Sequence, residues 1–460
     1  MSGSTPLSAS TRSLPATKSM RRLGQPIAIV SAKTADDVSA LHFLNAVFHG
    51  PSPGEFKAAL EDPYYESRDR LLIKGGRQIY GHVQITRRAI RFGHALIPAA
   101  GLRWLATAPE IRGRGFGAIL LRRAERLMVE RGAAVGLLST TQPAFFRRAG
   151  WIDCGDRNRW VAGVWQILAV LAQTDDYPKI RRPLDIRPVR RMEILDLARI
   201  YRLNTDGTYG PLERSETYWH WLVSRRAYDE ILVAIDWGKH RSRASSPPEI
   251  VGYAALKAGQ VLELMTAPGH PKSGVQLLCR ACGEAIEQGI DTLGIHLAEG
   301  HPLGSMLQRA GAAVSVGHPR HCEVLMAKLL SPDRMLQRLS VELLDRARRE
   351  GLGLPLELGF AVGNRKYQLA LAPAPRGLDH DKGRAPTAAS VGGGSVRRSH
   401  LRLDGTAFSQ LLLGAIAGGA GASAGVEGST KLARQTAAAL FPGHLLWRPP
   451  LDDLPVGARA

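Results

Sequence analysis

Residues 102–151 contain a glycine-rich loop between a predicted strand and a predicted helix, an arrangement that can bind an anionic ligand. A predicted strand at 102–106 ends in Ala108-Pro109-Glu110, and a 3.6-residue apolar periodicity over 115–131 predicts a long amphipathic helix. Between them lies a glycine-rich loop, Arg112-Gly113-Arg114-Gly115-Phe116-Gly117. Glycines remove the Cβ atoms that would block a ligand, and the free amides and dipole of the first helical turn attract an anion. The loop therefore predicts a phosphate site, and the alternative is a turn that only allows close helix–sheet packing.

The spacing of the glycines narrows the kind of anion. The loop lacks the dinucleotide pattern G-x-G-x-x-G, and the chain has no G-x-x-x-x-G-K-[ST] phosphate loop. At Arg112, Gly115 and Gly117 it resembles the GNAT superfamily of N-acetyltransferases, whose loop reads Arg/Gln-x-x-Gly-x-Gly/Ala. Downstream, Phe145-Phe146-Arg147-Arg148-Ala149-Gly150-Trp151 is similar to that family's aromatic-aromatic-x-x-x-Gly-aromatic element.

This resemblance implies a ligand and an activity. The co-substrate would be acetyl-CoA, and an acetyl or similar acyl group would pass to a primary amine by direct attack in a ternary complex, without a metal. The backbone of Leu105, Ala106 and Thr107 would bind the pantetheine arm. The pyrophosphate would lie on the amides of Arg112, Gly113, Arg114, Gly115, Phe116 and Gly117.

The catalytic residues do not follow from the resemblance. In that family a Tyr of the aromatic element acts as general acid, and its place here falls on Phe146, which has no proton to give. A C-terminal carboxylate serves as base there, whereas this chain continues through Asp452-Asp453 to Ala460. Catalytic candidates are Glu55, Glu66 and His82, and the first two belong to a small acidic and aromatic group suited to a cationic amine. That group comprises Glu55, Glu61, Asp62, Tyr64, Tyr65, Glu66 and Asp69, and its alternative interpretation is a solvated helix face.

The elements that must position these residues form a repeated pattern. From residue 26 the periodicity predicts strand, helices, antiparallel strands around Gly75-Gly76, helix, strand, helix and strand. A similar order recurs from residue 186 to residue 311, after a polar stretch at 173–188. A third module follows, with a helix at 335–349, a hairpin at 356–371 and a low-complexity stretch at 373–398.

This order resembles the tandem "enhanced intracellular survival" type of acetyltransferase. The implied fold class is α+β: a disordered tail at 1–25, a catalytic GNAT domain at 26–172, a degenerate GNAT-like domain at 181–330 and a sterol-carrier-like α+β domain at 331–460. In the second copy, Ala267-Pro-Gly-His-Pro-Lys-Ser-Gly274 lacks the loop pattern, so we expect no coenzyme there. The resemblance also implies a homo-oligomer, specifically a hexamer.

Composition adds limits on partners and location. The chain has 460 residues, so we expect several domains. The net charge of +20 would attract polyanions, but the arginine pairs lack interleaved aromatic residues, so nucleic acid is not the expected partner. No apolar stretch reaches the length of a membrane span and four cysteines are too few for a disulfide scaffold, so we expect a cytoplasmic protein. A non-catalytic acyl-CoA sensor, a lipid carrier and a nucleic-acid binder are the alternatives.

Overall fold

The computed structural model describes residues 27–155, 159–173, 183–237, 248–298, 300–315, 324–372 and 399–453. The predicted tail at 1–25 and the low-complexity stretch 373–398 lie outside these residues. The described chain divides into two compact units: unit 1 comprises 27–87 and 100–132, and unit 2 comprises 88–99 and 133–453.

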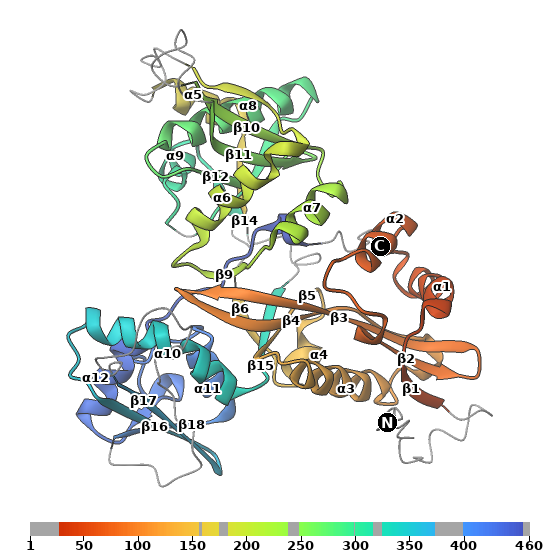
Figure 1. The fold of residues 1–460 in the computed structure, drawn as a ribbon, viewed down its shortest axis with the longest axis vertical. Helices are drawn as coiled ribbons and strands as arrows, with labels where there is room; N and C mark the ends of the chain where they lie inside the picture. The colour runs from red at the N-terminus through yellow and green to blue at the C-terminus, as the bar shows by residue number, and fades with distance from the viewer. Residues whose placement is uncertain are drawn as a thin grey trace, which may run out of the picture. The chain divides into compact units, whose positions relative to one another are not determined.

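Unit 1 is an antiparallel sheet with helices on both faces (Figure 1). In sheet order its strands are β1 (Ile27–Ser31), β2 (Arg70–Gly75), β3 (Gln78–Phe92) and β4 (Ala95–Thr107), the last two continuing into unit 2. The predicted hairpin at Gly75-Gly76 is confirmed, since Gly75 pairs with Gln78 and Gly76 has φ 60°. Helices α1 (Asp37–Phe48) and α2 (Pro53–Leu60) cover one face and α3 (Phe116–Glu130) covers the other.

Helix α3 forms for the reasons that its sequence indicates. The predicted apolar stripe is buried against the sheet, and its buried members are Phe116, Leu120, Leu121, Ala124, Leu127 and Met128. Gly132 ends the helix in a left-handed conformation, with φ 92°, and its amide donates to the carbonyl of Val129. The helix therefore begins and ends within about a residue of its predicted bounds.

Strands β3 and β4 are longer than the alternation at 79–85 and at 102–106 predicts. Arg87, Arg88 and Arg91 interrupt the apolar alternation of β3, but each cation has a partner that the sequence does not reveal. Arg87 pairs with Glu66 at 2.7 Å, Arg91 pairs with Glu213 at 2.6 Å, and Arg88 lies over the Tyr218 ring. Paired arginines can occupy a half-buried strand, so the sheet extends through them.

Unit 2 contains two exchanged strands, which connect the two halves of the repeat. Strand β15 (Val324–Leu329) comes from the second copy, yet it lies antiparallel between β5 (Val135–Thr140) and β6 (Ile152–Gly155) of the first copy. Conversely, β7 (Arg159–Gly163) follows β6 in sequence but pairs with β13 (Thr292–His296) and β14 (Ala313–Ser315). Each copy therefore completes the sheet of the other.

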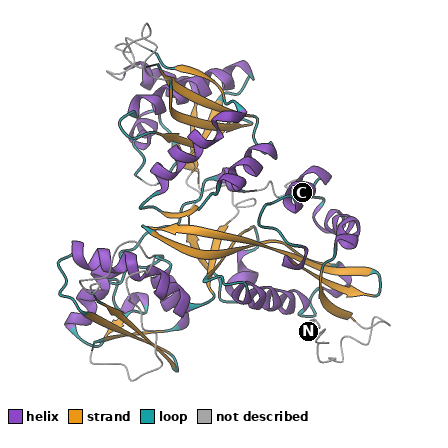
Figure 2. Ribbon diagram, in the orientation of Figure 1, coloured by secondary structure: helices purple, strands orange, loops and turns teal. Residues whose placement is uncertain are grey.

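The sheet of the second copy is covered by helices (Figure 2). Its strand order is β14-β7-β13-β12-β11-β10-β8, where the members not yet bounded are β8 (Asp185–Pro188), β10 (Glu230–Asp236), β11 (Glu249–Lys257) and β12 (Gln260–Thr266). The accompanying helices are α5 (Val164–Gln173), α6 (Ile194–Thr205), α7 (Glu216–Ser224), α8 (Pro271–Glu287) and α9 (Leu303–Arg309). Strand β9 (Tyr209–Leu212) instead pairs with β3.

Among the residues described from 331 onward, unit 2 ends in a four-stranded sheet with three α-helices. The predicted hairpin is confirmed as β16 (Leu356–Val362) and β17 (Arg365–Leu371), and β18 (His400–Leu403) pairs with β16 in parallel. The other elements of this part are α10 (Pro332–Arg349), α11 (Gly405–Leu412), β19 (Glu427–Gly428) and α12 (Lys431–Leu440). Helix α4 (Pro143–Arg147) belongs to the first copy and lies between β5 and β6 in sequence. The predicted α+β class is thus confirmed. None of the helices among the described residues is long and apolar enough to cross a membrane.

The turn between β3 and β4 gives a prediction on stability. Gly93 has φ 63°, and a Cβ built on it would lie 2.3 Å from the carboxyl carbon of Glu342 on α10. That carboxylate is buried and accepts from the His94 amide and from Arg346 Nε, at 2.9 Å each. We expect Gly93→Ala to lower the free energy of unfolding by roughly 3 kcal/mol, because the backbone strain adds to the loss of a charged hydrogen bond.

A second glycine provides the control for this prediction. Gly363 also has a positive φ, 52°, but a Cβ built there would meet no described heavy atom within 4 Å. Gly363→Ala should therefore lower the free energy of unfolding through backbone strain alone, by roughly 1 kcal/mol in urea denaturation. Equal losses in the two variants would contradict the role of Glu342.

Candidate active site

The glycine-rich loop of unit 1 is open to ligands. Gly113 and Gly115 have φ of 71° and 81°, conformations that favour glycine, and a Cβ built on either would meet no described heavy atom within 4 Å. Arg112 and Arg114 are exposed, and Arg112 Nε donates to the carbonyl of Thr107 at 3.2 Å. The loop is not filled by a neighbouring side chain among the described residues.

The backbone of this loop presents donors to the open side. Gly115 is the N-cap of α3, and its carbonyl accepts the first helical bond from the Ile119 amide at 3.1 Å. Amides of the first turn, from Phe116 onward, have no partner within the helix, and the helix dipole adds about half a positive charge there. No acidic side chain lies in the first turn of α3. The geometry is that of an anion cradle.

The predicted pantetheine-binding residues lie where β4 ends. Leu105 and Thr107 are half-buried and Ala106 is buried. The amide of Ala108, just beyond them, donates to the carbonyl of Tyr80 at 2.8 Å, so β3 still pairs with the chain there. Trp104 has φ 50°, an irregularity that the sequence does not indicate. Its ring stacks on Phe56 with centroids 5.9 Å apart.

His82 lies on β3 and is completely buried next to this irregularity. Its Nδ1 is 3.0 Å from the carbonyl of Trp104, so Nδ1 carries the proton and Nε2 has a free lone pair. Nε2 has no hydrogen-bond partner among the described residues. Burial lowers the pKa of His82 to about 3. His82 is therefore a neutral acceptor at physiological pH.

The two candidate glutamates are engaged in structural contacts. Glu55 forms a capping box with Ser52 at the start of α2, accepting from the Ser52 amide at 2.8 Å. Glu66 accepts from Arg68 and Arg87, and these partners lower the pKa of its carboxyl group to about 2. The buried Asp69 lies 3.4 Å from both Arg87 and Arg131. The acidic group therefore serves helix caps and ion pairs in unit 1.

The aromatic element lies in unit 2, between β5 and β6. Phe146 on α4 is buried and packs edge-on against Phe145 and Trp151, with centroids 5.0 Å and 6.0 Å apart. Gly136 on β5 leaves room for Trp151, since a Cβ there would lie 2.8 Å from the indole ring. Phe146 thus fills a packed aromatic cluster and provides no proton.

The corresponding loop of the second copy is packed where it enters α8. It precedes α8, and Pro271 at the start of that helix removes one of the free amides. Ser273 is fully buried, and its hydroxyl donates to the carbonyl of His270 at 2.7 Å. A Cβ on Gly274 would lie 3.1 Å from the side chain of Thr266. The residues next to α8 are therefore packed, whereas Gly269 further upstream has φ 83° and a Cβ built there would meet no described heavy atom within 4 Å.

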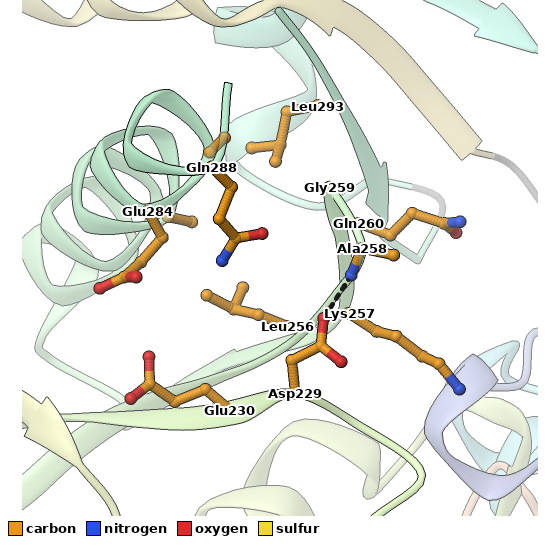
Figure 3. A pocket seen from close by; sticks show the side chains of 12 residues that line it. Asp229, Glu230, Leu256, Lys257, Ala258, Gly259, Gln260, Glu284, Gln288 and Leu293 are labelled. Atoms are coloured by element: carbon orange, nitrogen blue, oxygen red, sulfur yellow. Dashed lines mark hydrogen bonds between the residues drawn. The ribbon is translucent and has the colours of Figure 1, made fainter. Parts of the chain in front are cut away.

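A small pocket of about 30 Å³ lies elsewhere in unit 2, between the turns of the second sheet and α8 (Figure 3). Its lining includes Asp229, Glu230, Lys257, Glu284 and Gln288, and none of the predicted site residues. Burial and the charge of Glu284 raise the pKa of Glu230. Asp229 accepts from the amide of Ala258 at 2.6 Å, so this carboxylate braces the turn. No group of three or more metal-ligating side chains occurs among the described residues.

The burial of His82 predicts a pH dependence of stability. The unfolded state takes up a proton at about the ordinary pKa of 6.5, whereas the folded state does so only at about 3. The contribution of His82 is therefore complete above pH 6.5 and is lost as the pH falls from about 6.5 to about 3. The expected slope is about 1.4 kcal/mol per pH unit. His82→Asn, whose amide can replace the Nδ1 donor, should flatten this slope in urea denaturation at pH 4 to 7, and an unchanged slope would contradict the assignment.

Comparisons with known proteins agree with this geometry. Residues 28–152 match the family model for an acetyltransferase (GNAT) domain. Among proteins with curated descriptions, none matches the chain significantly. Solved structures show the same fold over nearly the whole chain. A GCN5-related N-acetyltransferase from Anabaena variabilis has a TM-score of 0.67 at 17% identity, covering 92% of this chain and 99% of its own.

Two further structures share the fold. A probable N-acyltransferase from Enterococcus faecalis has a TM-score of 0.68 at 14% identity, with 92% of this chain and 98% of the other covered. Eis1 from Mycobacterium abscessus has a TM-score of 0.56 at 14% identity, with 91% and 98% covered. The predicted tandem arrangement is confirmed at the level of the fold. Residues 28–152 thus match the GNAT acetyltransferase domain model, and the chain as a whole shares its fold with these N-acetyltransferase structures.

Proposed function

We propose that this protein transfers an acetyl or similar acyl group from acyl-CoA to a primary amine. The observation that supports this most strongly is the open cradle at residues 112–117, at the N-terminus of a 15-residue helix. Each hydrogen bond from an amide to a charged oxygen contributes about 1.5–3 kcal/mol, so several can hold a pyrophosphate. Leu105, Ala106 and Thr107 would bind the pantetheine arm through their backbone.

The reaction we propose is direct attack of the amine on the thioester within a ternary complex. An amine with a pKa near 10 is mostly protonated at neutral pH, so it must lose a proton before attack. Of the three candidates, His82 has an unpaired acceptor nitrogen, whereas Glu55 and Glu66 have their oxygens in caps and ion pairs. Because burial lowers the pKa of His82 to about 3, its imidazole is too weak a base to take this proton, and we propose that the proton leaves through water instead. Orientation of the two substrates supplies much of the remaining acceleration.

The roles of the other domains are also proposals. The second copy, at 181–330, would be a scaffold without coenzyme, as the missing loop pattern at 267–274 and Pro271 at the start of α8 suggest. The C-terminal domain, at 331–460, would be sterol-carrier-like, and its sheet with α10 and α12 is compatible with that architecture.

The competing function is a non-catalytic acyl-CoA sensor, which Phe146 favours because it cannot act as an acid. Release of free thiol from acetyl-CoA, measured against a panel of small amines, peptides and polyamines, separates the two. The enzyme predicts thiol release that depends on amine concentration and saturates. Micromolar binding of acetyl-CoA with no amine-dependent release would favour the sensor.

A further inference from the structure

Three buried polar side chains of unit 1 lie on one face of its sheet. Arg70 on β2 pairs with Gln84 on β3, and His82 precedes Gln84 by two residues. Alternate residues of a strand point to the same face, and cross-strand partners lie side by side, so the three side chains share that face. None of them is more than 1% exposed. We call Arg70, His82 and Gln84 the polar cluster.

Helices α1 and α2 cover the polar cluster. The guanidinium of Arg70 lies 5.3 Å from the ring centroid of Phe56 on α2, and its Nη2 donates to Asp37 on α1. The side-chain nitrogen of Gln84 lies 3.5 Å from the carbonyl oxygen of Ala59, also on α2, which is too long for a strong hydrogen bond. The cluster is therefore enclosed between helices and sheet within unit 1.

Several atoms of the polar cluster have no hydrogen-bond partner among the described residues. They are the donors Nε and Nη1 of Arg70 and the acceptors Nε2 of His82 and Oε1 of Gln84. Nε2 is an acceptor because the other ring nitrogen, Nδ1, donates to the carbonyl of Trp104 at 3.0 Å. Buried polar atoms in proteins are rarely left unpaired. Donors and acceptors that do not satisfy one another therefore point to a bound polar group.

The mixture of donors and acceptors selects the class of this group. A carboxylate or a phosphate could accept from Arg70, but the lone pairs of His82 and Gln84 would repel it. An ammonium group could donate to those lone pairs, but the charge of Arg70 would repel it. A hydroxyl group both donates and accepts, so it matches the whole cluster. His82 stays an acceptor at neutral pH, because burial and the charge of Arg70 lower its pKa.

We propose that Arg70, His82 and Gln84 form a buried binding site for a hydroxyl group, which belongs either to a water molecule or to the amine acceptor. The second source rests on the proposed acyl transfer. The site is connected to the proposed coenzyme site through His82, which binds the carbonyl of Trp104. Trp104 has a strained φ of 50° and directly precedes the residues proposed for the pantetheine arm.

The ¹⁵N resonance of His82 Nε2 tests the site, and two other histidines serve as references. An unprotonated imidazole nitrogen that accepts a hydrogen bond resonates upfield of one that does not. His301 Nδ1 accepts from the Leu303 amide at 3.2 Å and marks the bonded position. His444 Nε2 has no partner among the described residues, and a Cβ built on Gly414 would lie 2.2 Å from it, so it marks the free position.

All three rings are neutral near pH 8, because burial lowers the pKa of His82 to about 3 and that of His301 and His444 to about 4. In the protein without substrates, we expect His82 Nε2 to resonate near the bonded reference, since water then occupies the site. A resonance at the free position would overturn the proposal.

A pair of variants on β3 tests whether the cluster acts together. Gln84→Met removes one acceptor at nearly the same side-chain size, so the hydroxyl group is held less firmly. The His82 Nε2 resonance should move toward the free position. Gln78→Met, the same change at an exposed position of β3, is the control and should leave the resonance in place. Equal resonances in the two variants would contradict a hydroxyl group shared by His82 and Gln84.

A matched pair of amines separates the two sources. Ethanolamine and n-propylamine have nearly the same size, and only ethanolamine carries a hydroxyl group. If the acceptor supplies the group, kcat/KM should be at least about tenfold higher for ethanolamine, and magnetisation transfer from water to the His82 ring protons should disappear when it binds. If water supplies it, the transfer persists and the two amines react alike. Absence of amine-dependent thiol release would refute the proposed acyl transfer, whereas the His82 resonance would still test the site.

Discussion

Gly115→Glu is expected to abolish the binding of coenzyme A. The substitution places a β-carbon where φ is 81° and a carboxylate in the open space above the first turn of α3. The carboxylate would occupy the position of a phosphate and repel the other phosphate, so the backbone donors of the loop would be lost together. We expect the affinity in calorimetry to fall at least about 100-fold, which corresponds to about 2.7 kcal/mol or two charged hydrogen bonds.

The same helix offers a matched control for this variant. Gly132 follows the other end of α3, has φ 92°, and a Cβ built there also meets no described heavy atom within 4 Å. Gly132→Glu therefore introduces the same strain and the same charge at the opposite end of the helix. We expect it to lower stability as Gly115→Glu does but to leave the affinity for coenzyme A unchanged. Equal affinity in both variants would refute the cradle.

Arg214→Met is expected to produce the largest loss of stability. It leaves the carboxylates of Glu263 and Asp452 buried without their shared cation, and it removes the stacking of the guanidinium on Tyr201, 3.9 Å from the ring centroid. Removal of one partner from a buried ion pair destabilises a protein by about 3–5 kcal/mol. We expect a loss of this size in the free energy of unfolding, measured by urea denaturation near pH 8.

The pH dependence of this variant identifies the cause of the loss. Unpaired buried carboxylates take up protons more readily, so the loss in Arg214→Met should shrink as the pH falls toward 5. Arg280→Met is the control, because Arg280 pairs with Glu284 at an exposed site on α8 and its loss should stay within about 0.5 kcal/mol. A similar loss of unfolding free energy in the two variants would contradict the claim that Arg214 neutralises two buried carboxylates.

The parts of the fold that depend on local chemistry could be predicted from the sequence. The apolar stripe of α3, its flanking glycines and the hairpin at Gly75-Gly76 are all encoded within a few residues. The glycines of the loop at 112–117 are also a local feature, because glycine permits the left-handed conformations that Gly113 and Gly115 adopt. The limits of the domains remain a prediction.

The exchange of strands could not be predicted in this way. The alternation within β7 and within β15 predicts a strand, but nothing in either segment selects its partner. Pairing depends on which sheet edge is left open after the rest has folded. Strand β15 pairs with the edges of both β5 and β6, which lie more than a hundred residues earlier in the chain.

In the candidate site, too, local features could be predicted but contacts between distant residues could not. The acidic group at 55–69 suits a cationic amine by composition, but the partners of Glu66 include Arg87 and Arg131, which are distant in sequence. Ion pairs with residues distant in sequence cannot be inferred from a local pattern, so the sequence could not show that Glu66 is neutralised.

The most direct test of the central claim observes the loop amides themselves. In deuterated, ¹⁵N-labelled protein, titration with coenzyme A should shift the amide resonances of Gly113, Gly115, Phe116 and Gly117 downfield, since charged oxygens accept hydrogen bonds from them. The same amides should not respond to pantetheine, which lacks the diphosphate. Saturable coenzyme binding that leaves these four resonances in place would contradict the account.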